Sequence, residues 1–182
     1  MKIVGEKFES GEYFLTHLML AGEAMKVATK ILTSKISQEK RDELERRKKG
    51  IVVAGTVKGD IHDIGKNLLI ALLEANGFTV YDLGVDVDSM AFIEKAKAVG
   101  ADIICMSALL TSSIPAQKEV IDFLVAQGLR DKFLIMVGGG LTSKEWAESI
   151  GADGWAPTAV EAVRVAEKLI EQRRAHMKEG GN

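Results

Sequence analysis

The chain has 182 residues, with 24 Lys and Arg against 26 Asp and Glu, and a formal net charge of −2. A near-neutral chain lacks the basic face that nucleic acids select, and its single cysteine excludes a disulfide framework and a cysteine-built zinc site. It has no apolar run of the ~18 residues that a membrane span needs and no apolar signal core at its N-terminus. We therefore expect a cytoplasmic protein with no nucleic-acid partner and no membrane partner.

The first predicted element is a long helix over residues 12–33. Its apolar residues recur at intervals of three and four, which is the period of a helix face. They form two stripes, one of Phe14, Leu18, Ala21, Met25, Ala28 and Leu32, the other of Leu20, Ala24, Val27 and Ile31. A helix with two apolar stripes needs cover on two sides. A charged segment over residues 35–49 follows, interpreted as a solvated helix or linker. We assign residues 1–48 to a helical domain with this linker.

Residues 49–182 form the second predicted domain, in which short apolar runs alternate with helical patterns. Five strands are predicted at residues 50–54, 78–83, 102–106, 133–137 and 153–156. Helices are predicted at about 65–76, 89–99, 114–127, 142–149 and 158–174, with glycines that favour a helix end after four of them. Thr142 and Glu145 predict a capping box. Five strand–helix units with short connections predict an α/β fold, a flavodoxin-like or Rossmann-like five-stranded parallel sheet with helices on both faces.

Parallel sheets bind ligands at the carboxyl ends of their strands, so the loops there are the candidate site. The loop of residues 55–65 is long for this kind of connection and places His62 between Asp60 and Asp63. Serine and threonine are frequent in residues 107–113, after the third predicted strand, and three glycines occupy residues 138–140, after the fourth. The candidate site is therefore shared by three loops.

Common nucleotide-binding and signalling motifs do not fit these loops. Gly55, Gly59 and Gly65 lack the spacing of a dinucleotide-binding motif. The sequence after Gly65 lacks the hydroxyl residue of a P-loop. A phospho-accepting receiver would have an aspartate where the third predicted strand ends in Ser107. These three classes are excluded.

Each loop residue alone has a plain structural interpretation. Asp60 suits a local turn, Asp63 a helix cap, and the glycines a loop or a phosphate cradle. An aspartate two residues before His62 can also bind one ring nitrogen and leave the other as a metal ligand. One histidine without a second nearby His or Cys cannot hold a bare metal ion. The metal would have to arrive already held in a macrocycle.

Residues 60–65 (Asp-Ile-His-Asp-Ile-Gly), 107–109 (Ser-Ala-Leu) and 138–139 (Gly-Gly) resemble the D-x-H-x-x-G, S-x-L and G-G motifs of cobalamin-binding domains. Over about residues 11–169 the chain resembles, more narrowly, the methyltransferase corrinoid proteins and the cobalamin module of methionine synthase. The N-terminal helix then resembles a short version of the helical-bundle cap that covers the upper face of the corrin. It departs at Thr16, where many relatives have proline.

The resemblance implies a role for each motif residue. His62 would be the lower axial ligand of cobalt in place of the cofactor's own base, and Asp60 would hold its ring. Ser113 would extend this relay, although a hydroxyl in the first turn of the next helix explains it equally well. The other implied positions contact the corrin or line a slot for the nucleotide tail: Gly59, Ile61, Asp63, Gly65, Ser107, Leu109, Thr111, Gly138, Gly139 and Ala156.

The implied function is to carry a methyl group on cobalt, alternating between Co(I) and methyl-Co(III). A donor-specific methyltransferase, using methanol, a methylamine or an aryl methyl ether, would load it. A second would pass the methyl group to tetrahydrofolate or coenzyme M, and a reductive activator protein would restore Co(I). We expect no enzymatic activity from this chain alone, because it has no further base or nucleophile set.

Two other function classes and an assembly state stay open at this level. The shared D-x-H-x-x-G motif also suits the small subunit of an adenosylcobalamin-dependent mutase, and cobalamin binding alone suits a sensor or storage protein. The second stripe of the N-terminal helix predicts a homodimer, or cover by a partner methyltransferase, because an apolar face left in water promotes association.

Overall fold

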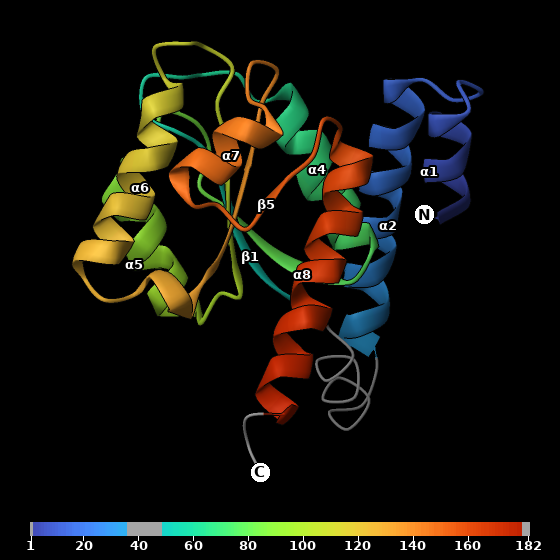
Figure 1. Ribbon diagram of the computed structural model, residues 1–182. Helices are drawn as coiled ribbons and strands as arrows, with labels where there is room; N and C mark the ends of the chain where they lie inside the picture. The colour runs from blue at the N-terminus through green and yellow to red at the C-terminus, as the bar shows by residue number, and fades with distance from the viewer. Residues whose placement is uncertain (1, 36–48, 180–182) are drawn as a thin grey trace.

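Figure 1 shows the computed structural model of the protein, which describes residues 2–35 and 49–179. Its centre is a five-stranded parallel sheet with the order β2-β1-β3-β4-β5. The strands are β1 (Gly50–Thr56), β2 (Phe78–Asp82), β3 (Ile103–Ser107), β4 (Leu134–Gly138) and β5 (Gly154–Trp155). The α/β class and all five predicted strands are confirmed.

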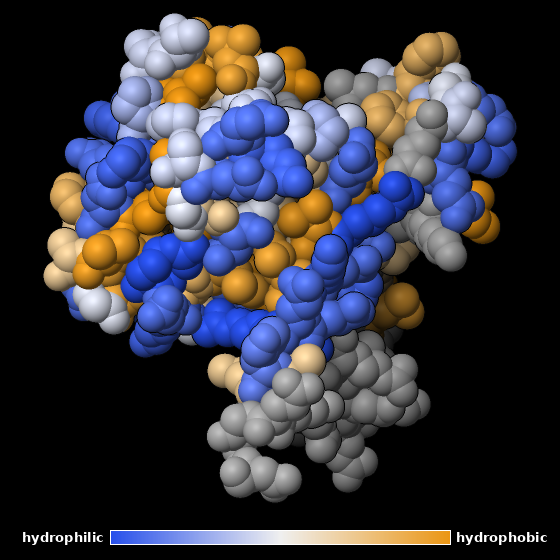
Figure 2. Space-filling model, viewed as in Figure 1, coloured by the Kyte–Doolittle hydropathy of each residue, from blue (hydrophilic) through white to orange (hydrophobic). Residues whose placement is uncertain are grey.

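Helices cover both faces of the sheet (Figure 1). The layer on one face contains α5 (Ser89–Val99), α6 (Ile114–Ala126), the 3-10 turn η1 (Arg130–Lys132) and α7 (Lys144–Ile150). The other face is covered by α4 (Ile64–Ala75) and α8 (Ala159–Glu179). Outside α4 lies α2 (Leu15–Lys35), and α1 (Lys2–Glu9) packs on α2. The outer side of α8 is hydrophilic along most of its length (Figure 2), so this helix needs no further cover there.

The strands form because their apolar runs are buried on both faces. Val52, Val53 and Ala54 of β1 are each at most 1% exposed, and alternate residues enter opposite cores. At the edge of the sheet, β2 ends in exposed Tyr81 and Asp82. Burial of the continuous runs at the centre of the sheet is the main driving force for this arrangement.

The strand register aligns the three candidate loops. Thr56 of β1 pairs with Ser107 of β3, and Ser107 pairs with Gly138 of β4. The connection after β1 leads to β2 on one side, whereas the connections after β3 lead away on the other side. The boundary between β1 and β3 is therefore the topological switch point, where sheets of this type bind ligands.

The N-terminal helix covers the sheet domain with only part of its predicted apolar surface. Leu18 is 1% exposed and belongs to the core under α4. Gly22 lets α2 approach α4 closely, because a Cβ there would lie 3.2 Å from that of Ala71. Leu20 and Val27 of the second stripe are 70% and 54% exposed. The second stripe is thus left uncovered in this chain, as expected. The first stripe is covered only in part, because Leu18 is buried and Ala21 half-buried, whereas Phe14, Met25 and Leu32 are 69%, 44% and 65% exposed.

The structure corrects the predicted start of α7. The predicted capping box at Thr142 is wrong: Ser143 is the N-cap of α7, and its hydroxyl accepts a hydrogen bond from the backbone of Trp146 at 3.2 Å. The Thr142 hydroxyl instead donates to the Gly139 carbonyl. The charged segment of residues 35–49 lies almost wholly outside the described residues. In the part of the chain that is described, no helix is long and apolar enough to cross a membrane.

Candidate functional site

The switch point brings the loop after β1 against the loop after β3. Asp60, in the first loop, is fully buried, and its two carboxylate oxygens are bonded to different loops. Oδ1 accepts from the backbone N–H of His62 at 3.0 Å and lies 2.7 Å from the His62 ring nitrogen Nδ1. Oδ2 accepts from the backbone N–H of Leu109 at 2.6 Å, that of Leu110 at 3.1 Å and the Ser113 hydroxyl at 2.8 Å. Asp60 therefore joins the two loops.

These bonds determine the charge of Asp60. Burial alone would raise the pKa of its carboxyl group, but the N–H groups of Leu109 and His62 with the Ser113 hydroxyl outweigh burial and hold the pKa well below its ordinary value. Folding lowers this pKa, so the hydrogen bonds to Asp60 stabilise the folded protein at pH values above the ordinary pKa of a carboxyl group. That stabilisation is lost as the pH falls into strong acid. Asp60 is an anion throughout the physiological range.

His62 is held at its ring and at its backbone. Its side chain is 48% exposed, and its carbonyl accepts from the buried Thr56 hydroxyl at 2.8 Å. With Nδ1 occupied by Asp60, Nε2 is the nitrogen left for a ligand. A carboxylate behind the ring fixes the tautomer and strengthens the other nitrogen as a metal ligand. The predicted Asp60–His62 pair is thus present with the geometry of a metal-binding histidine.

The two interpretations of Ser113 are both met in part. It occupies the N-cap position of α6 but makes no side-chain capping bond there. Its hydroxyl is buried and reaches Asp60 instead. Ser113 therefore belongs to the hydrogen-bonded group behind His62.

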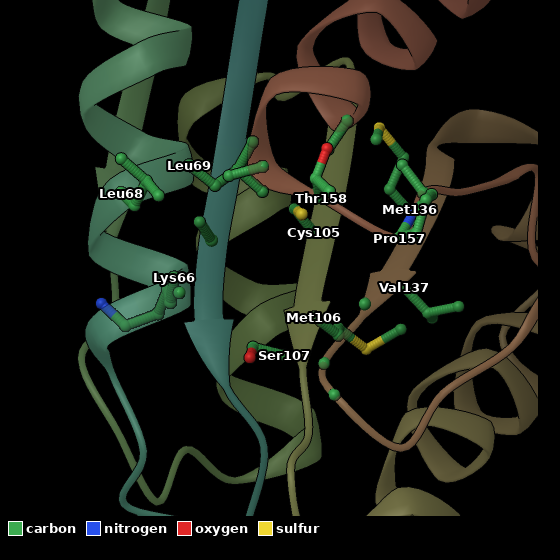
Figure 3. Close-up of a pocket in the computed structure, with 18 of the residues that line it drawn as sticks. Lys66, Leu68, Leu69, Cys105, Met106, Ser107, Met136, Val137, Pro157 and Thr158 are labelled. Carbon is green, nitrogen blue, oxygen red and sulfur yellow. The ribbon is translucent and has the colours of Figure 1, made fainter. Parts of the chain in front are cut away.

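A cavity of about 360 Å³ opens beside the loop after β1, between α4, the strand ends and the start of α8. Figure 3 shows Leu68 and Leu69 of α4 on one side, Cys105 of β3 on the sheet, and Thr158 on the segment that leads into α8. Burial raises the pKa of the Cys105 thiol to about 12, so this residue is a neutral part of an apolar wall. The mainly apolar lining suits an apolar group better than a charged one.

Five of the predicted tail-slot and corrin positions line this cavity: Gly65, Ser107, Gly138, Gly139 and Ala156. Two predicted slot residues do not. Leu109 and Thr111 are exposed and lie outside the cavity wall, since the chain turns away after Ala108 so that the Leu109 backbone can bind Asp60. The positions expected near the corrin edge are exposed beside His62: Gly59, Ile61 and Asp63.

The two glycines at the end of β4 have different structural reasons. At Gly138 an added Cβ would meet nothing within 4 Å, so the open space there belongs to the cavity. Gly139 has φ +125°, and an added Cβ would lie 1.7 Å from the Ala108 carbonyl oxygen. Any side chain at residue 139 would thus collide with the protein itself, whereas one at residue 138 would only fill the cavity.

Both tryptophans help to hold the glycine segment of residues 138–140 in place through hydrogen bonds. Sequence patterns did not predict this role. Trp146 Nε1 donates to the side-chain oxygen of fully buried Gln117, whose amide nitrogen donates to the carbonyls of Met106 and Gly138. Trp155 Nε1 donates to the Thr142 hydroxyl, which holds the Gly139 carbonyl. This network fixes the ends of β3 and β4. Phe8 of α1 also lines the cavity without any sequence signal for that role.

Known proteins are similar to this chain in sequence and in fold. Residues 50–164 match the B12 binding domain family, and residues 1–33 match a further B12 binding domain family. The chain is 49% identical over 170 residues to a corrinoid protein of Desulfitobacterium hafniense (strain Y51), spanning 93% of this chain and 78% of that protein. It is 44% identical over 170 residues to dimethylamine corrinoid protein 3 of Methanosarcina mazei, spanning 93% and 99%. A methanol:cobalamin methyltransferase complex from Methanosarcina barkeri contains a chain similar in structure, with a TM-score of 0.78, 29% identity and coverage of 91% and 61%.

A parallel sheet with a carboxylate-bound histidine and an apolar slot at its switch point fits a corrinoid. The Nε2 of His62 could bind the metal of such a group, and the open space at Gly138 could admit part of it. The class is that of cobalamin-binding α/β proteins. The chain belongs to the B12 binding domain family and, within it, to the methyltransferase corrinoid proteins, with cobalamin as its cofactor.

Proposed function

We propose that this protein is the cytoplasmic methyl carrier of a methylamine or methanol methyltransferase system. The single observation with most weight is the buried Asp60 carboxylate that joins His62 to the loop after β3. Several relatives are named for dimethylamine, and one solved relative belongs to a methanol:cobalamin methyltransferase complex. The partners would be a donor-specific methyltransferase, a second methyltransferase acting on tetrahydrofolate or coenzyme M, and a reductive activator protein.

The residues of this chain would bind the cofactor with its own base displaced and His62 on the metal. When bound, the corrinoid supplies a cobalt that accepts and donates a methyl group. Asp60 orients the His62 ring through Nδ1 and stays ionised, so it would stabilise the positively charged ring if Nε2 left the metal and took up a proton. Ser113 and the backbone of Leu109 keep Asp60 in place. The half-exposed ring allows that proton to exchange with solvent.

A labelling experiment tests the carrier function. After reduction, the cobalamin-loaded protein should take up label from [14C]methyl iodide in proportion to bound cobalamin. The label should then pass to coenzyme M or tetrahydrofolate when the purified second methyltransferase of a methylamine system is added. Cobalamin-free protein is the control. A loaded, methylated protein that passes no label to either acceptor is not a methyl carrier, and the sensor or storage alternative would replace the proposal.

The mutase alternative has less support. Two helices, α1 and α2, precede β1, and their segment matches a B12 binding domain family of its own. We propose that residues 1–48 form a short cap beside the corrin-binding end of residues 49–182. A mutase subunit loaded with cobalamin and reduced would also react with methyl iodide but would not pass the label to coenzyme M or tetrahydrofolate, so the transfer step separates the two functions.

We also propose that two copies pair through the exposed face of α2. Leu20, Met25 and Leu32 are 70%, 44% and 65% exposed on this helix, and Val27 is 54% exposed. A twofold pair needs only one self-complementary surface, and it would bury roughly 600–1,000 Å², at the low end for a specific interface. Light scattering should show a concentration-dependent dimer, twice 19.7 kDa, in the micromolar range.

Variants can confirm where the dimer forms. Leu20→Glu with Val27→Glu is expected to give a monomer, because it places charges in the interface. Val125→Glu is the matched control, since Val125 is 60% exposed on α6, in the helix layer on the opposite face of the sheet. A monomer at high micromolar concentration for the unmodified chain would refute the dimer.

A further inference from the structure

We propose that Asp86 is a positioning residue that fixes the backbone of Gly59 and Asp60 and thereby aims His62. Asp86 lies in the connection between β2 and α5, on the side of the His62 loop away from β3. The inference rests on the proposed function, because it concerns how the metal ligand of that site is held.

Two hydrogen bonds in opposite directions join Asp86 to the His62 loop. The Asp86 carboxylate oxygen Oδ1 accepts from the Gly59 N–H at 2.9 Å. The Asp86 N–H donates to the Asp60 carbonyl at 2.9 Å. The Gly59 N–H and the Asp60 carbonyl lie on either side of the Asp60 Cα along the backbone. The carboxylate on that Cα holds the His62 ring. Asp86 thus fixes the loop from the β2 side, as Leu109 and Ser113 do from the β3 side.

Asp86 adopts a backbone conformation that other side chains avoid. Its φ is +53°, and among the described residues it is the sole non-glycine residue with a positive φ. Aspartate and asparagine tolerate this region best after glycine, and most other residues are strained there. Glycine would remove the strain but also the acceptor for Gly59. The bond from the Gly59 N–H to the carboxylate explains an aspartate at a position where conformation alone favours glycine.

The charges around Asp86 keep it ionised. Lys58 Nζ lies 3.4 Å from Asp86 and 3.7 Å from Asp88, and all three side chains are substantially exposed. The Gly59 N–H and then the Lys58 side chain lower the pKa of the Asp86 carboxyl group. The ion pairs with Lys58 are worth little at such exposure. The bond to Gly59, made only by Asp86, therefore distinguishes Asp86 from Asp88.

Spectroscopy of the loaded protein tests this role. In Asp86→Ala we expect the equilibrium between metal-bound and free His62 to shift by roughly tenfold toward free, as for a lost hydrogen bond to a charged group. Electron paramagnetic resonance of the Co(II) state gives the bound fraction. The Co(II)/Co(I) midpoint potential should rise, because axial coordination favours Co(II) over four-coordinate Co(I). Asp86→Asn should restore both values, because asparagine keeps the acceptor and tolerates the conformation.

Two further variants separate positioning from a merely structural role. Asp86→Gly relieves the strain but removes the acceptor, so it should fold stably and still show the shift. Asp88→Ala, which keeps both loop bonds, should match the unmodified protein. Unchanged bound fraction and potential in Asp86→Gly would overturn the proposal, whatever its melting temperature. If the unmodified protein shows no histidine nitrogen on cobalt, the proposed binding of His62 to the metal itself fails, whereas the carrier function is tested separately by transfer of the label.

Discussion

His62→Ala is expected to remove the axial nitrogen that this protein supplies to cobalt. The unpaired electron of Co(II) couples to an axial nitrogen, so protein labelled with [15N]histidine should show a doublet in place of the 14N triplet. That signal should vanish in the variant. Cobalamin should still bind through the cavity, with an affinity lowered by at least the roughly 10–100-fold that loss of a partner behind a metal ligand costs.

His176→Ala is the matched control, because His176 is exposed on α8 and bonds only to the Gln172 carbonyl among the described contacts. It should retain the 15N doublet. A doublet that persists in His62→Ala, or a 14N triplet in the labelled unmodified protein, would show that another base binds the metal and would contradict the assignment.

Asp60→Asn extends this test to the group behind the ring. Five donors converge on the carboxylate, two on Oδ1 and three on Oδ2. The side-chain amide of asparagine would place its own NH2 donor against one of these two groups of donors. Such a mismatch costs about 1–3 kcal/mol. We expect lower stability and a Co(II)/Co(I) midpoint potential with altered pH dependence. An unchanged potential at every pH would remove Asp60 from the relay.

The sheet and the Asp60–His62 pair could be predicted from the sequence because each depends on short-range patterns. Continuous apolar runs define strands buried on both faces, and a two-residue spacing is enough to bring a carboxylate to a ring nitrogen. Backbone donors have no such signature. The N–H groups of Leu109 and Leu110 bind Asp60 only because the loop after β3 folds back, and no residue type signals that.

Other parts of the site depend on long-range packing. Thr142 and Ser143 are both good caps in sequence, and only the approach of Trp155 to the Thr142 hydroxyl decides which of them caps α7. The role of Gln117 depends on the adjacent ends of β3 and β4. Phe8 reaches the cavity from a helix outside the sheet layers. Sequence periodicity cannot predict such contacts, because each joins residues from distant segments.

Substitutions of the two glycines at the end of β4 are expected to have different effects. One should keep the cofactor out of a folded protein, and the other should also lower the stability of the fold. Gly138→Val should fold normally, since its Cβ meets open space, yet its branched side chain should fill the cavity and abolish detectable cobalamin binding. Gly139→Ala should lower the melting temperature as well, because its Cβ would lie 1.7 Å from the Ala108 carbonyl oxygen at a φ of +125°. Avoiding that overlap requires the loop after β3 to move, and that loop holds Asp60.

Cobinamide, which lacks the nucleotide tail, distinguishes the two effects. If the tail occupies the cavity, Gly138→Val should bind cobinamide as the unmodified protein does, because His62 and its loop are intact. Gly139→Ala should weaken the binding of both corrinoids, because moving Ala108 also displaces the Leu109 N–H that holds Asp60. Isothermal calorimetry with each corrinoid and thermal melts of the apoprotein give the four comparisons. Normal cobalamin binding by a folded Gly138→Val protein would mean that the tail lies outside this cavity.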